Sequence, residues 1–456
     1  MNEKNKTMIF VGAAIVFVAL AFVTAPRKIT PDSFFEQGEL FFPDFINPND
    51  AKTLEVIDYD EVTGSARPFK VTFSEGRWTI PSHHNYSADA QDRLAKTAAG
   101  VIGIKKDDFR SDNIADHEAF GVVDPLDETV VSPKGRGQRV TVKGDNDIIL
   151  ADFIVGKKAE GRESIRFVRL PGQKRVYAVR MDIDISTNFS DWIETDLLKV
   201  VQTNINQVIL KDYSIDERTR RVNERDVLTL DKKEDLWQAN RMTEKQEVDD
   251  TKMNDLLTSL DNLSIVGVRP KPPGLTQSLQ KSAGDITVTD SDMLSLQSKG
   301  YFFSQDGRLL SNEGELQART NDGVTYTLRF GEIVYGTGEA VTAGTDTAVI
   351  ESSGPGENRY LFITTAVNED YFKEPEKPEN TDFLTKADSL WTDEDRKNKE
   401  LDDAYEDWKS KVENGMQISK DLNARFAQWY YVISADSFEK LHLTRNDLVK
   451  EKEKEK

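Results

Sequence analysis

The chain of 456 residues contains no cysteine and only four histidines. Without cysteine there is no disulfide, no zinc–thiolate site and no thiol nucleophile, and cysteine usage says nothing about the redox compartment. Basic residues are also in the minority, because 60 Lys and Arg stand against 80 Asp and Glu, a formal net charge of −20. A field of this sign repels phosphate backbones, so we expect no nucleic acid partner.

Sequence motifs of the common enzyme classes are missing as well. The chain has no GxSxG elbow, no HExxH helix, no P-loop, and no GxGxxG placed between a strand and a helix. Acidic pairs are inevitable among so many carboxylates, so a glycosidase-like pair cannot be singled out. We therefore expect a protein that is not an enzyme and that uses no cofactor.

One long hydrophobic run interrupts this polar sequence. Residues 8–25, "MIFVGAAIVFVALAFVTA", are uncharged, and as a helix they would extend about 27 Å, close to the hydrocarbon thickness of a bilayer. A signal peptide cleaved after Ala21 is the alternative, whereas Pro26 disfavours cleavage after Ala25. We favour a helix anchored in membrane lipid. No second such run follows, so we expect the bulk of the chain on the periplasmic side of a bacterial inner membrane.

The rest of the chain repeats itself. "FKVTFSEGRWTI" (69–80) is matched by "DVLTLDKKEDLWQA" (226–239), and in each an alternating segment leads through a charged turn to Trp78 or Trp237. This pattern predicts a strand, a turn and a second strand, followed in each copy by a helix. Further matched pairs of segments are 100–105 with 264–269, 139–156 with 317–331, 165–179 with 347–363, and 176–199 with 429–450.

The repeat organises the predicted fold. We expect an α+β class, with a single N-terminal transmembrane helix followed by two tandem, strand-rich α+β repeats, the second interrupted by a helical insertion. The expected segments are 1–28 for the N-terminal segment and anchor, 29–49 for a linker, 50–200 and 201–450 for the repeats, and 451–456 for a charged tail.

The insertion, about residues 368–425, predicts two helices. Thr392 and Asp395 have the spacing of a capping box, and Gly415 separates the first helix from a short second one that folds back. The first helix carries an apolar stripe of Leu401, Tyr405, Trp408 and Val412. Packing within the chain and a surface for a partner helix both explain such a stripe.

Two adjacent histidines, His83 and His84, are weak candidates for metal ligands. Adjacent residues of an extended segment point to opposite faces, and a metal needs them to converge with other donors. The matched connector of the second copy, "NRMTEKQEVDD" (240–250), contains no histidine. We therefore interpret the pair as connector residues.

Several of these segments together resemble a known family, the bacterial domain of unknown function 4340. The resemblance implies a membrane-anchored accessory subunit of a gliding-motility-type ABC transporter, working with an ATPase, a permease and an auxiliary extracytoplasmic subunit. It supplies no catalytic residues. The segments that carry it are "GRWTIPSHHNYSADA" (76–90), "AFGVVDP" (119–125), "FIVGKK" (153–158), "RFVRLPGQKRVYAV" (166–179) and "GRLLSNEGELQARTNDGVTYTLRFGE" (307–332).

Two functions of different kinds follow from these patterns. The first is a non-enzymatic extracytoplasmic scaffold subunit of an ABC-transporter-like assembly. The alternative is an extracytoplasmic module that binds a glycan, lipid or peptide through aromatic residues such as Trp192, Trp391 or Trp408. An envelope hydrolase ranks below both, since His83 and His84 are its only histidine-based candidates.

Overall fold

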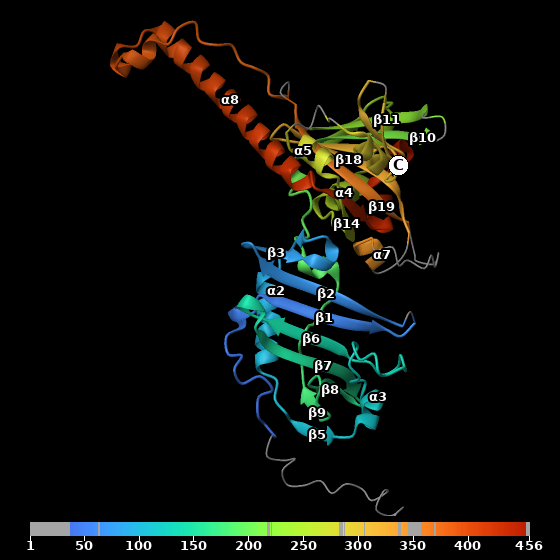
Figure 1. Cartoon of the computed structure of the whole chain (residues 1–456). Coiled ribbons are helices and arrows are strands. Elements are labelled where there is room, and N and C mark those ends of the chain that lie inside the picture. The colour runs from blue at the N-terminus through green and yellow to red at the C-terminus, as the bar shows by residue number, and fades with distance from the viewer. Residues whose placement is uncertain are drawn as a thin grey trace, which may run out of the picture. The chain divides into compact units, whose positions relative to one another are not determined.

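The chain forms two compact units (Figure 1). The first contains residues up to 72 and residues 91–185, and the second contains residues 73–90 and 186–456. The chain therefore enters the second unit, returns to the first, and enters the second again. The computed structural model describes residues 37–62, 64–216, 219, 221–281, 286, 288–304, 306–335, 339–344, 357–368 and 371–452.

The predicted membrane anchor, residues 8–25, lies outside the described residues. Within the described part of the chain, no helix combines the length and the apolar character needed to cross a bilayer.

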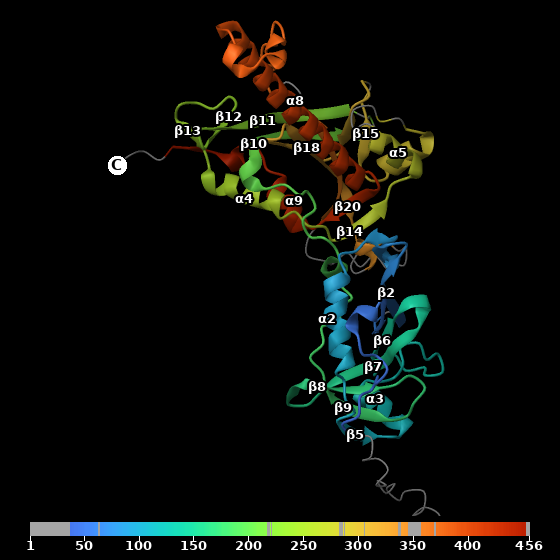
Figure 2. The same cartoon turned by 90° about the vertical axis from the view of Figure 1, so that its left-hand side faces the viewer.

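One large sheet has nine antiparallel strands in the order β4-β3-β2-β1-β6-β7-β8-β9-β5. Leu54 and Val56 of β1 are fully buried, and Glu55 between them points to the other face. Helix α2 is amphipathic, buries Leu94 and Val101, and runs along the sheet (Figure 2). The bounds are β1 Thr53–Asp60, β2 Ser65–Ser74, β3 Arg77–Ile80, β4 Tyr86–Ser87, α2 Gln91–Ile102, β5 Asp108–Ser111, α3 His117–Phe120, β6 Gln138–Lys143, β7 Ile149–Ala159, β8 Arg162–Arg169 and β9 Val176–Arg180.

The other large sheet has eight antiparallel strands in the order β12-β11-β10-β17-β18-β19-β20-β14. Its strands are β10 Ile205–Asp216, β11 Arg221–Lys233, β12 Leu236–Ala239, β14 Gly267–Pro270, β17 Glu315–Thr320, β18 Val324–Val334, β19 Asn358–Val367 and β20 Trp429–Ile433. Two small sheets pair β13 Gln246–Val248 with β21 Val449–Glu451, and β15 Tyr301–Phe303 with β16 Leu309–Ser311. The helices are α4 Asp250–Asp261, α5 Pro273–Lys281, α6 Asp290–Gln297, α7 Glu339–Thr342, α8 Asp393–Phe426, α9 Ala435–Leu441 and α10 Arg445–Leu448.

The two large sheets have the same strand order. Strands β3-β2-β1-β6-β7-β8-β9-β5 correspond in sequence order to β12-β11-β10-β17-β18-β19-β20-β14. Trp78 lies in β3 and Trp237 in β12, and the long helices α2 and α4 follow these strands. Both sheets are therefore built on one topology.

The predicted fold class, with a transmembrane helix ahead of two tandem α+β repeats, is wrong. Large antiparallel sheets of nine and eight strands dominate the described chain, and no helix in it could span a membrane. Alternating patterns reveal the local hairpins, but they do not reveal which hairpins pair with each other. The pairings of β1 with β6 and of β10 with β17 join hairpins that are distant in the sequence into single sheets.

The insertion contains one long helix where two were predicted. The capping box of Thr392 and Asp395 is confirmed, but α8 continues for 34 residues through Gly415. A Cβ atom on Gly415 would lie 2.6 Å from the carbonyl oxygen of Asp322, in the turn between β17 and β18. The glycine therefore allows a close approach of backbones and does not end the helix.

Alanine at Gly415 is expected to destabilise the second unit by about 1–3 kcal/mol, because its methyl group would push α8 away from Asp322. The direction of the change in unfolding free energy tests the contact. Replacing glycine with alanine at an exposed helical position without such a contact would stabilise the protein by up to about 1 kcal/mol. Ser410→Ala, at an exposed position of α8, is the control. Stabilisation by Gly415→Ala in urea unfolding would contradict the close contact.

Tryptophan fluorescence is a probe for such measurements that reports mainly on the second unit, because Trp78 alone among the tryptophans lies in the nine-stranded sheet. All six tryptophans lie within residues 73–90 or 186–456 and so belong to the second unit. They are Trp78, Trp192, Trp237, Trp391, Trp408 and Trp429.

Candidate functional site

A row of charged side chains crosses the second large sheet. Lys211 of β10, Glu315 of β17 and Arg329 of β18 stand directly opposite one another in the strand register. Lys211 Nζ lies 2.6 Å from Glu315 Oε1, and Arg329 Nε lies 3.3 Å from Glu315 Oε2. The register thus aligns a cation, a carboxylate and a second cation across three strands. We call these three residues the charged row.

The neighbouring row explains why the charges share one face. Leu210, Leu316 and Leu328 are also opposite one another, and all three are buried. Because side chains alternate along a strand, burial of the leucines turns the charged row to the other face.

Glu315 lies at the centre of the row and is the most buried of its members. Its side chain is 5% exposed, against 15% for Arg329 and 33% for Lys211. Gln317 also donates from Nε2 to Glu315 Oε1 at 3.1 Å. Three donors therefore stabilise a carboxylate that would otherwise be costly to remove from water.

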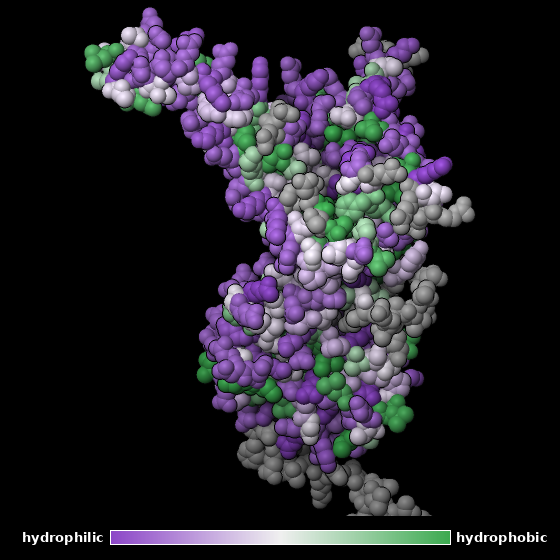
Figure 3. Space-filling model, turned by 45° about the horizontal axis from the view of Figure 1, so that its top comes forward, coloured by the Kyte–Doolittle hydropathy of each residue, from purple (hydrophilic) through white to green (hydrophobic). Residues whose placement is uncertain are grey.

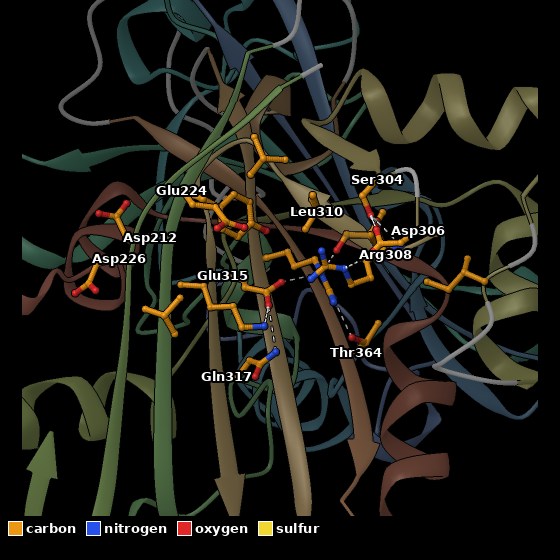
Figure 4. A pocket seen from close by; sticks show the side chains of 18 residues that line it. Asp212, Glu224, Asp226, Ser304, Asp306, Arg308, Leu310, Glu315, Gln317 and Thr364 are labelled. Atoms are coloured by element: carbon orange, nitrogen blue, oxygen red, sulfur yellow. Dashed lines mark hydrogen bonds and ion pairs between the residues drawn. The ribbon is translucent and has the colours of Figure 1, made fainter. Parts of the chain in front are cut away.

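The charged row lines a cavity of about 620 Å³ (Figure 4). Strands β10 and β11 contribute Tyr213 and Val222 to its lining, and the β15–β16 hairpin contributes Leu309 and Leu310. Arg329 connects the elements of the cavity, because it also donates from Nε to the carbonyl oxygen of Leu309 at 2.9 Å and from Nη1 to Thr364 Oγ1 at 3.0 Å.

Three other acidic residues that line the cavity also have basic partners, and Glu224 adds a further carboxylate to the lining. The described ion pairs are Asp212–Arg225 at 2.6 Å, Asp226–Arg445 at 2.8 Å and Asp306–Arg308 at 2.6 Å. The hydrogen bond from Arg445 dominates in lowering the pKa of Asp226. The cavity is thus rich in hydrogen-bonding groups, and most of its charges are balanced in pairs.

A smaller cavity of about 90 Å³ adjoins the first, and both are lined by Val222, Ser304 and Leu310. The remaining lining of the smaller cavity is mainly apolar and includes Met293 and Leu296 of α6 and Phe302 and Phe303 of β15.

The two candidate histidines pack against the α7 segment of the second unit. His83 is buried, and its Nε2 lies 2.9 Å from Thr342 Oγ1 and its Nδ1 3.0 Å from Ser82 Oγ. Its ring stacks on Phe189 with centroids 4.5 Å apart. Burial, aided by the charges of His84 and Arg269, lowers the pKa of His83 to about 4, so its imidazole is neutral at pH 7.

His84 also makes a structural contact, since its Nε2 lies 2.7 Å from the carbonyl oxygen of Ala343. Over the described part of the chain, no group of three or more His, Cys, Asp or Glu side chains could hold a metal ion. Both histidines lie between β3 and β4, and His83 is a core residue.

The apolar stripe of α8 lies against a preceding segment of its own chain. Trp408 donates from Nε1 to the carbonyl oxygen of Phe372 at 2.9 Å, and Lys377 Nζ lies 5.0 Å from the centre of the Tyr405 ring. Val412 is buried, while Leu401, like both aromatic residues, is half-buried. These contacts are those of packing within the chain.

The tryptophans considered for ligand binding have structural contacts too. Trp192 is completely buried and donates from Nε1 to the carbonyl oxygen of Ser186 at 3.0 Å. Trp391 donates from Nε1 to the carbonyl oxygens of Phe383 and Lys386. Trp192 therefore exposes no ring face, whereas Trp391 is half-buried.

The amino-terminal half of α8 extends away from the second sheet (Figure 1). Its carboxyl-terminal half packs on β19 through two hydrogen bonds. Thr365 Oγ1 donates to the carbonyl oxygen of Ser419 at 2.9 Å, and Asn423 Nδ2 donates to the carbonyl oxygen of Thr365 at 2.7 Å. We call residues 381–411 the arm.

The end of the arm has a small core of its own. Phe383 is buried and packs edge-on against Trp391, and Lys386 Nζ lies 2.7 Å from Asp395 Oδ1. The hydrogen bond from Lys386, with those from Thr392, lowers the pKa of Asp395 to about 2. These contacts join the loop before α8 to the first turn of the helix.

Two leucines at the end of the arm face solvent. Leu384 is 67% exposed and Leu390 is 71% exposed. Figure 3 shows hydrophobic side chains gathered at this end, whereas the arm behind it is mostly hydrophilic.

The chain was compared with known families, curated proteins and solved structures. Residues 78–281 match the family "Domain of unknown function (DUF4340)". The DUF4340 segment begins at Trp78 in β3 and ends at Lys281, the last residue of α5, so it includes Lys211 but not Glu315, Arg329 or the arm. Neither a curated protein nor a solved structure matches the chain.

Proposed function

We propose that the chain is a non-enzymatic accessory subunit that docks onto partner proteins through the end of its arm. The observation that carries the proposal is the pair of exposed leucines, Leu384 and Leu390, on an ordered projection. Exposed apolar groups gathered at one place are typical of protein contact sites.

The construction of the arm supports docking. The first turn of α8 has a complete capping box, and Lys386 and Phe383 anchor the preceding loop to it. A contact surface that is already ordered loses less conformational entropy on binding. The core at the end of the arm thus presents Leu384 and Leu390 in a fixed arrangement.

The assembly that we propose is an ABC-transporter-like complex with an ATPase, a permease and an auxiliary extracytoplasmic subunit. The sequence resemblance to the family supports this partner class. The proposed location is the bacterial inner membrane, with the two compact units on the extracytoplasmic side.

Glutamate at both Leu384 and Leu390 is expected to reduce recovery of the ATPase and permease with this chain by at least about tenfold, because charges would be buried in the contact. The measurement is affinity purification in mild detergent followed by quantitative mass spectrometry. Stability should not change, since both side chains are exposed.

The matched control is glutamate at both Ile148 and Ile149, which are 62% and 60% exposed in the first unit. This control should recover partners at the wild-type level. Recovery of the wild-type chain alone, or equal recovery with the arm variant, would refute the proposal.

The proposed location is tested with a single introduced cysteine, because the chain has none of its own. Lys450 is a suitable site, since its side chain is 48% exposed. We expect an impermeant maleimide to label Lys450→Cys in cells whose outer membrane alone is permeabilised. Labelling only after lysis of the inner membrane would place the carboxyl terminus in the cytoplasm.

A further inference from the structure

We propose that the two adjoining cavities of the second unit bind one amphiphilic ligand, a glycoside with a neutral, polyhydroxylated head and a short apolar chain. The head occupies the larger cavity over the charged row, and the chain occupies the smaller cavity. This goes beyond the docking function and uses residues that are separate from the arm.

The balance of charge in the larger cavity favours an uncharged head. Glu315 neutralises one of its two cationic neighbours, Glu224 adds one carboxylate that offsets the other, and Asp212, Asp226 and Asp306 each have an arginine partner. A carboxylate or phosphate that entered this site would be repelled by those acidic groups, and a cation would have to compete with the arginines for the same carboxylates. A neutral ligand avoids both costs.

The same groups retain hydrogen-bonding capacity that hydroxyl groups can use. The ammonium group of Lys211 has three N–H donors, of which Glu315 accepts one, and a carboxylate can accept several hydrogen bonds. Gln317 and Thr364 add an amide and a hydroxyl from the neighbouring strands. A ligand with several hydroxyl groups, each both donor and acceptor, matches such a mixed lining.

The sizes and linings of the cavities favour one ligand across both. The larger, at about 620 Å³, lies in the range of small-molecule sites. The smaller, at about 90 Å³, has room for a short alkyl segment against Met293, Phe302 and Phe303. Since Val222 and Leu310 line both cavities, the two lie side by side, and a chain attached to the head needs to pass only these side chains to enter the apolar one.

Comparison with the first unit indicates that the larger cavity is not an inevitable result of the topology. There a similar cross-strand row, Glu55, Thr141 and Asp152, also lies opposite the buried face. Arg139, beside this row, bonds to Asp152 and also to Asp124 of the loop between β5 and β6. In the second unit the segment between β14 and β17 instead forms α5, α6 and the β15–β16 hairpin that lines the cavity.

Isothermal titration calorimetry of the full chain tests the proposal with n-hexyl β-D-glucoside below its micellar concentration. Glucose, hexanoate and the hexyl ether of diethylene glycol are the comparison ligands. We expect one hexyl glucoside per chain, bound at least about tenfold more tightly than any comparison ligand.

Two variants locate the site. Val222→Glu places a charge between the cavities and should weaken the binding of hexyl glucoside by about tenfold or more. Met293→Glu places a charge in the smaller cavity, so this variant should bind hexyl glucoside no more tightly than glucose. Leu236→Glu, at an exposed position of β12 outside both cavities, is the matched control and should bind as the wild type does.

Several results would overturn the proposal. The first is that hexyl glucoside shows no saturable binding. The second is that hexanoate binds more tightly than hexyl glucoside, or that the hexyl ether binds equally well. The third is that Leu236→Glu weakens the binding of hexyl glucoside as much as the two site variants do. Partner recovery through the arm does not depend on these outcomes, so the two proposals fail separately.

Discussion

Replacing Glu315 with glutamine is expected to destabilise the second unit by about 3 kcal/mol. The change leaves the cationic groups of Lys211 and Arg329 on one face of the sheet without the carboxylate between them, and removing one partner of a buried ion pair is strongly destabilising. The expected loss of stability lies toward the low end of the range for buried ion pairs, because the side chain of Lys211 is one-third exposed. Urea unfolding followed by tryptophan fluorescence measures it.

Two further variants make this result specific. Lys211→Met, added to Glu315→Gln, should restore part of the lost stability because it removes one of the uncompensated cations. Glu55→Gln is the control in the first unit, where Glu55 pairs with Lys143 at 3.0 Å near solvent, and it should not move the fluorescence transition. A loss below about 1 kcal/mol for Glu315→Gln would mean that the charged row contributes no more than a surface ion pair.

Acidification from pH 6.5 to pH 4 is expected to remove about 3 kcal/mol of stability from the second unit through His83 alone. The folded state lowers the pKa of His83 from 6.5 to about 4, so between these values the unfolded chain takes up a proton that the folded chain excludes. This contribution is fully present above pH 6.5 and is lost as the pH falls toward 4. Each pKa unit corresponds to about 1.4 kcal/mol.

The difference in unfolding free energy between the wild type and His83→Gln isolates the contribution of His83, because the other titrating groups are common to both proteins. Glutamine retains hydrogen-bonding atoms toward Thr342 but does not titrate in this range. The stability advantage of the wild type over the variant should therefore shrink steadily from pH 6.5 to pH 4. Parallel stability curves would show that His83 is not held neutral by burial.

Local features of the fold could be predicted from the sequence because their causes are local. The hairpins that lead to Trp78 and Trp237 follow from alternation, and both are present as strands β3 and β12 with their partners. The helix expected after the second hairpin is α4, and Asp249 caps it by accepting hydrogen bonds from the amides of Thr251 and Lys252.

The charged row could not be predicted, because its members belong to three strands and only the register aligns them. Each strand does carry a signal, namely a charged residue beside a leucine in "ILK", "EL" and "LR". The signal acquires meaning only once Leu210, Leu316 and Leu328 are known to be opposite one another. Gly415 was misinterpreted for a similar reason, since the atom that requires glycine belongs to Asp322, in a distant turn.

Because residues 73–90 belong to the second unit, the connection after Ile185 is not where that unit begins. An amino-terminal fragment that ends at residue 185 would carry His83, whereas Thr342 and Phe189 would remain on the other fragment. Neither piece would hold a complete second unit. Split at this connection and expressed together, the halves are natural candidates for reassembly by complementation, with residues 73–90 as the missing piece that one supplies to the other.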